Sequence, residues 1–132
     1  MKRTVLDASA VISFFEDRSG AEEVEELVAE SVAGKAELFI SVVNWGEVYY
    51  SIWRAHGQDA ARKAVAEISQ LPIEVVNADS ELTKTAAELH ARHKLPYADC
   101  FAAALAKIRK GSLVTSDQDF AKVKSEIEIR FL

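Results

Sequence analysis

Short apolar runs alternate with amphipathic segments along nearly the whole chain, and this alternation limits the folds it can adopt. The apolar runs are rich in β-branched residues and are bounded by polar or turn-forming residues, as buried strands are. We predict strands over residues 4–6, 37–41, 73–76, 112–115 and 127–131. Because helical segments separate these strands, we expect a parallel sheet covered by helices on both faces.

The helical segments begin and end at residues that favour helix termini. We predict helices over residues 11–15, 21–32, 42–56, 59–71, 80–93 and 97–110, with a short one from Phe120. Ser9, Ser41 and Asp79 are expected N-caps, Pro96 should open helix 97–110, and Gly111 should close it. The 132 residues contain no repeat or linker, so we predict one α/β domain over residues 1–132. Its expected architecture is a three-layer sandwich around a central parallel sheet of four to five strands.

Helices 21–32 and 42–56 each have a defined apolar face. In the first, the residues at helical spacing are Val24, Leu27, Val28 and Val32. In the second, the apolar face is formed by Val42, Trp45, Val48, Tyr49, Ile52 and Trp53. We expect this aromatic stripe to be core or subunit interface. Gly46 costs about 1 kcal/mol relative to alanine inside a helix, and a close backbone approach would explain it.

Composition excludes some classes of protein. No run approaches the roughly 20 apolar residues of a membrane helix, and an acid ends the first apolar run, so a cytoplasmic protein is expected. Cys100, the only cysteine, cannot form an internal disulfide and should be a reduced core thiol. The net charge of −5 argues against a broad basic nucleic-acid surface. It is compatible with a small site in which a metal supplies the positive charge.

Four acids occupy positions that packing does not explain. Asp7 and Asp117 each follow a predicted strand, Asp99 lies in the first turn of helix 97–110, and Glu47 is on the polar side of helix 42–56. Each alone has an ordinary alternative: a turn residue, an N-cap, a partner of the helix dipole or a solvated side chain. Together they are expected at one edge of the sheet, because ligands bind beyond the carboxyl ends of parallel strands.

Four carboxylates gathered at one edge would repel each other unless a cation compensates their charge. Oxygen ligands favour hard divalent ions, which here means Mg²⁺ or Mn²⁺. Such an ion activates water and stabilises a leaving phosphate. The residues therefore point to hydrolysis of a phosphodiester.

Four segments in order resemble the successive motifs of PIN-domain ribonucleases, and their size and order are similar to the VapC-type toxins of toxin–antitoxin pairs. The segments are residues 5–9, 41–48, 98–106 and 113–120. The resemblance runs from residue 4 to about residue 120 and implies a single PIN-like domain.

The resemblance implies an Mg²⁺- or Mn²⁺-dependent endoribonuclease that is the toxin of a type II toxin–antitoxin system. Asp7, Glu47, Asp99 and Asp117 match the acidic quartet that holds the metal and carries catalysis. Matching positions with supporting roles are Ser9, Asn44, Thr115 and Asp119. The resemblance also implies a homodimer and a small VapB-like antitoxin that inserts a segment into the active-site groove.

RNA binding requires some positive surface. Arg92 and Lys94 lie just before Asp99, and Arg54 shares the polar side of its helix with Glu47, so these are possible RNA contacts. The alternative for the first two is a basic helix end that complements the dipole. His90 and His93 are three residues apart on one helix but have no third ligand nearby in the sequence.

Other functions remain open at this point. One is a catalytically silent PIN-like binding module, which the presence of all four acids disfavours. Another is a phosphatase with Asp7 as nucleophile, but haloacid-dehalogenase-type enzymes need an aspartate at the position of Ser9. A Gly-x-Ser-x-Gly hydrolase and a phosphate-binding glycine loop both lack their motifs.

Overall fold

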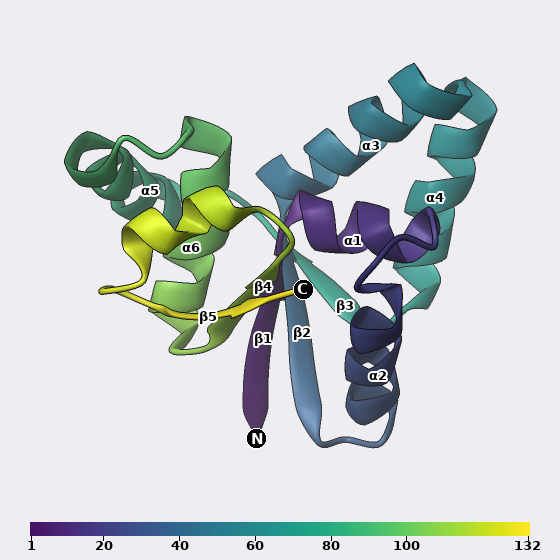
Figure 1. Ribbon diagram of the computed structural model, residues 1–132, viewed down its shortest axis with the longest axis horizontal. Helices are drawn as coiled ribbons and strands as arrows, with labels where there is room; N and C mark the ends of the chain where they lie inside the picture. The colour runs from purple at the N-terminus through teal and green to yellow at the C-terminus, as the bar shows by residue number, and fades with distance from the viewer.

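The computed structural model describes residues 1–132 and contains one sheet of five parallel strands in the order β3-β2-β1-β4-β5 (Figure 1). The strands are β1 (Lys2–Leu6), β2 (Ala36–Ser41), β3 (Ile73–Val76), β4 (Ser112–Thr115) and β5 (Glu128–Phe131). The predicted parallel sheet is confirmed. Its central strand β1 pairs with both β2 and β4, which brings the first and fourth strands of the chain side by side.

Helices cover both faces of the sheet. On one face lie α1 (Ala8–Phe15), α2 (Ala21–Val32), α3 (Val42–His56) and α4 (Gln58–Gln70). On the other lie α5 (Ser80–His93), α6 (Tyr97–Arg109) and the 3₁₀ helix η1 (Gln118–Val123). Alternation along β1 separates the two cores: Val5 belongs to the α5–α6 side, whereas Leu6 belongs to the α1–α4 side. None of the helices is both long enough and apolar enough to cross a bilayer.

Two positions in the helices differ from what the sequence pattern suggested. Val32, at the end of α2, is 74% exposed and does not join Val24 and Leu27 in the core. A Cβ at Gly46 would meet no atom within 4 Å, so no close backbone approach explains this glycine. Helix α3 therefore contains a glycine beside open space, and an alanine would fit there.

The end of α6 also differs from the prediction. Helix α6 ends at Arg109, and Lys110 rather than Gly111 adopts the left-handed conformation, with φ of 54°. Gly111 is required for another reason: a Cβ there would lie 2.5 Å from the carbonyl oxygen of Arg3. The turn between α6 and β4 therefore presses directly on the backbone of β1.

The side chain of Glu126 joins elements of the α5–α6 face. It accepts hydrogen bonds from Arg92 at 2.9 Å, from Lys107 at 2.6 Å and from His93. The bond from Lys107, followed by those from His93 and Arg92, lowers the pKa of Glu126 to about 2. The segment before β5 is thus tied to both α5 and α6.

We expect Glu126→Gln to lower the melting temperature by a few degrees at pH 7, because the neutral amide cannot pair with the three basic groups. A carboxylate whose pKa is depressed in the folded state stabilises it above its unfolded pKa of about 4.5. The difference between parent and variant should therefore shrink as the pH falls from about 4.5 to about 2. Thermal melts of the parent and Glu126→Gln across this pH range test the prediction. A difference in melting temperature that does not depend on pH would contradict it.

Candidate functional site

The first acid, Asp7, directly follows β1 and caps helix α1. Its carboxylate accepts hydrogen bonds from the backbone amide of Ala10 at 2.9 Å, from Ser9 Oγ at 2.7 Å and from Thr115 Oγ1 at 2.7 Å. Asp7 is only 4% exposed. The prediction that Ser9 is the N-cap is therefore wrong, because the extended backbone of Asp7 lets its own carboxylate reach the amide three residues on.

Ser9 and Thr115 connect the end of β1 to the end of β4. Ser9 Oγ accepts from the amide of Ser116 at 3.0 Å, and Thr115 Oγ1 accepts from the amide of Asp117 at 3.0 Å. Asp117 in turn caps η1 by accepting from the amide of Asp119 at 2.9 Å. Two loops more than a hundred residues apart in sequence are thus held together through the hydroxyls that donate to Asp7.

Glu47 projects from the second turn of α3 and is held by Asn44. The side-chain amide of Asn44 donates to Glu47 Oε1 at 2.8 Å and to the carbonyl oxygen of Ala98, on α6, at 3.1 Å. Asp99 is the next residue on α6, in its first turn. The packing of α3 on α6 therefore brings the second and third acids towards the strand ends that carry Asp7 and Asp117.

The electrostatics of Asp99 indicate how closely the acids gather. Burial raises the pKa of this half-buried carboxyl to about 7, assisted by repulsion from Glu47, Asp117, Asp7 and Asp119. Burial also raises the pKa of Asp7, against the hydrogen bonds that it accepts and with a contribution from Asp117. The structure thus brings together the four predicted acids and Asp119. None of the five forms an ion pair with a basic side chain.

A group of carboxylates without basic partners can bind a hard divalent cation. The carboxylates offer only oxygen atoms as ligands, and their negative charge balances that of the cation. As the side chains lie here, no three acids surround one point as ligands. Mg²⁺ commonly takes only one or two protein carboxylates and retains several waters, so binding it does not require three acids around one point. Closer ligation would require rotation of the partly exposed side chains of Glu47, Asp99 and Asp117.

The predicted RNA contacts have different surroundings. Arg54 is exposed on α3, with its guanidinium 5.0 Å from the centre of the Tyr50 ring. Arg92 is paired with Glu126, whereas Lys94 is exposed at the end of α5. The histidines do not form a metal site: His93 contacts Glu126, and His90 Nδ1 lies 2.6 Å from the carbonyl oxygen of Leu95.

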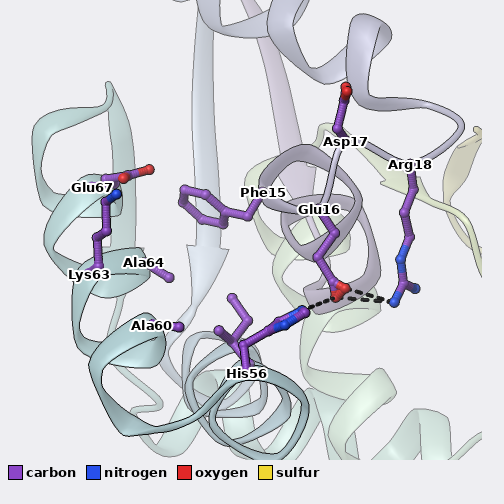
Figure 2. Close-up of a pocket in the computed structure, with 10 residues that line it drawn as sticks. Phe15, Glu16, Asp17, Arg18, His56, Ala60, Lys63, Ala64 and Glu67 are labelled. Carbon is purple, nitrogen blue, oxygen red and sulfur yellow. Dashed lines mark hydrogen bonds and ion pairs between the residues drawn. The ribbon is translucent and has the colours of Figure 1, made fainter.

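A separate cavity of about 550 Å³ lies between the ends of α1 and α3 and the side of α4 (Figure 2). Its lining includes the apolar side chains of Phe15 and Ile52 together with several charged side chains. Figure 2 shows Glu16 between Arg18 and His56. One carboxylate oxygen of Glu16 lies 2.8 Å from Arg18 Nη2, and the other lies 3.8 Å from His56 Nε2. The sequence analysis missed this cavity, because its lining residues come from separate segments and share no motif.

The chain matches a protein-family model and, by its fold, several solved structures. A family model described as PIN domain matches residues 4–126. A sequence search of curated proteins found no significant match.

Several solved structures share the fold. The chain is similar to a toxin–antitoxin complex from Klebsiella pneumoniae, with 23% identity and a TM-score of 0.67 over 89% of this chain and 90% of that one. VapBC2 from Rickettsia felis, bound to a DNA fragment from its promoter, has 15% identity and a TM-score of 0.75 over 97% of each chain. VapC20 from Mycobacterium tuberculosis, described as a toxin that cleaves the sarcin–ricin loop, has 20% identity and a TM-score of 0.73 over 96% and 98%. At these identities the likeness concerns the fold.

Proposed function

We propose a function for this chain, which belongs to the PIN-domain family. It is a metal-dependent endoribonuclease and the toxin of a type II toxin–antitoxin pair. The observation that carries the proposal is the group of five acids without basic partners. Burial raises the pKa of Asp99 to about 7, and repulsion from the other four acids adds to that rise. Such a concentration of negative charge is costly to fold and is compensated when a divalent cation binds.

In this proposal Asp7, Glu47, Asp99 and Asp117 hold Mg²⁺ or Mn²⁺. When bound, such an ion lowers the pKa of a water and stabilises the charge that develops on the phosphate. The protein's own contribution is to fix the carboxylates. Asp7 is oriented by hydrogen bonds from Ser9 and Thr115 and by the α1 amide.

The remaining supporting residues act on the other acids. Asn44 donates a hydrogen bond to Glu47, and the Asp119 amide orients Asp117. For RNA we favour Lys94 and Arg54, which are exposed, over Arg92, whose guanidinium would have to leave Glu126.

Two partners follow from the same proposal. The structural neighbours include toxin–antitoxin complexes, which supports a small VapB-like antitoxin as a partner of this chain. The aromatic stripe of α3 supports a homodimer, because the side chain of Trp53 remains 43% exposed and is available to a second copy of the chain. Equilibrium sedimentation of the protein alone and with a candidate antitoxin tests both.

One observation favours a catalytically silent PIN-like binding module instead: no three acids surround one point as ligands. Calorimetric titration of the purified protein with Mn²⁺, followed by incubation with RNA, separates the two functions. The nuclease should bind Mn²⁺, cleave RNA in Mn²⁺ or Mg²⁺, lose at least about a hundredfold of its rate in excess EDTA, and recover when the metal is restored. Absence of Mn²⁺ binding and of cleavage would favour the silent module, and cleavage that survives EDTA would contradict the metal-dependent mechanism.

A further inference from the structure

We propose that Asn44 is a positioning residue that holds Glu47 towards Asp99 by joining α3 to α6, an inference that rests on the proposed metal-dependent nuclease. Asn44 lies in the first turn of α3 and is only 1% exposed. Its amide nitrogen has two hydrogens and two acceptors: Glu47 Oε1 at 2.8 Å and the carbonyl oxygen of Ala98 at 3.1 Å. One side chain thus bonds to one acid and to the residue directly before another.

The other end of the amide supports this assignment. Asn44 Oδ1 is buried and has no hydrogen-bond partner. An unpaired buried acceptor is costly, and an apolar side chain of similar size would avoid that cost. The reverse orientation of the amide would direct its oxygen at two other acceptors. What accounts for an asparagine here is therefore the pair of bonds that its nitrogen donates.

The consequence concerns two acids that repel each other. Both side chains carry a carboxyl group, so without a restraint the partly exposed side chain of Glu47 would gain by rotating towards solvent. The bond from Asn44 opposes that rotation, and the bond to Ala98 holds α3 against the first turn of α6. Groups that orient a metal-binding carboxylate in this way typically change metal affinity or activity by 10- to 100-fold when they are removed, and we expect about that range here.

The test compares Asn44→Leu with Asn77→Leu, which makes the same chemical change at the exposed Asn77 of the loop after β3. Calorimetry with Mn²⁺ alone should give about 10- to 100-fold weaker binding for Asn44→Leu and parental binding for Asn77→Leu. In RNA cleavage, kcat should fall by a similar factor while KM changes less than about threefold, because the residue positions a metal ligand rather than RNA. The melting temperature of the metal-free protein in EDTA should change by only a few degrees.

A merely structural role would lower the melting temperature in EDTA and leave Mn²⁺ affinity at the parental value, and that result would overturn the inference. Asn44→Ser, whose hydroxyl can donate one hydrogen bond, should retain intermediate Mn²⁺ affinity and decides the matter if the leucine variant does not fold. If the parent binds Mn²⁺ and cleaves RNA while both Asn44 variants match it, only this inference fails. If the parent does neither, the proposed function fails and this inference fails with it.

Discussion

Replacing Asp99 with asparagine is expected to slow RNA cleavage by at least about a hundredfold while making the metal-free protein more stable at pH 8. The loss of activity follows because the amide removes one of the charges that would hold the cation. Such an ion is worth several kcal/mol in the transition state, and each 1.4 kcal/mol corresponds to a factor of ten in rate. The melting temperature is expected to rise, because the negative charge of Asp99 destabilises the folded state and asparagine removes it.

The pH dependence of that gain follows from the pKa of Asp99, which burial and neighbouring acids raise from 3.8 to about 7. An acid whose pKa is raised by folding leaves the folded state fully stable below pH 3.8, and the stability declines as the pH rises towards 7. The advantage of Asp99→Asn should therefore be absent near pH 3.5, grow between about pH 4 and pH 7, and stay constant above pH 7. Because this carboxyl is partly exposed, solvent reduces the effect to a few degrees in melting temperature.

Thermal melts in EDTA at pH 4, 6 and 8, with RNA cleavage in Mn²⁺ alongside, measure both effects. The exposed Asp59, in the first turn of α4, supplies the control Asp59→Asn, which should leave cleavage unchanged. Addition of Mn²⁺ should reduce the advantage of Asp99→Asn, because the ion compensates the charge only in the parent. Full cleavage by this variant would remove Asp99 from the proposed catalytic group.

Alanine at Gly111 and alanine at Gly46 are expected to have opposite effects on stability. At Gly111 the new Cβ would lie 2.5 Å from the carbonyl oxygen of Arg3, and because that atom is backbone, β1 and β4 must separate to accept it. We expect a loss of about 3 kcal/mol and a fall of about 10 °C in melting temperature. At Gly46 the new Cβ meets nothing within 4 Å, so alanine should stabilise α3 by about 1 kcal/mol.

Urea denaturation of the two alanine variants and the parent gives both free energies under the same conditions. Each variant serves as the control for the other, since the same methyl group is added in both and only its surroundings differ. A Gly111→Ala protein within 1 kcal/mol of the parent would mean that the turn after α6 can move away from β1 at little cost. A destabilised Gly46→Ala protein would indicate that something covers this side of α3, such as a second copy of the chain.

Local pattern predicted most of the elements. Helix α3 over Val42–His56 and strand β3 over Ile73–Val76 match their predicted bounds, because apolar periodicity and terminal residues such as Ser41 and Gly57 act within a few residues. The gathering of acids at one edge of the sheet also followed from local rules. Asp7 and Asp117 follow strands, and parallel strands end at the same edge.

Contacts between residues far apart in the chain could not be predicted from the sequence. The bond from Asn44 to Ala98 spans 54 positions, and the pairing of Arg92 with Glu126 spans 34. The closeness of Gly111 to Arg3 and the open space beside Gly46 likewise depend on how neighbouring elements pack. The N-cap of α1 was predicted wrongly as Ser9, because Asp7 is an equally good capping residue and the choice depends on where β1 ends.

The sequence alone thus determined the succession of strands and helices along the chain, the parallel sheet and the edge of the sheet where the acids meet. Hydrophobic periodicity and the direction of parallel strands, on which these features depend, act through local chemistry. Tertiary structure alone decided which side chain orients each acid, how far each acid is desolvated, and which glycine is indispensable. These properties depend on distances between atoms far apart in the chain, and small shifts in packing change hydrogen bonds and charge repulsion without altering any local pattern.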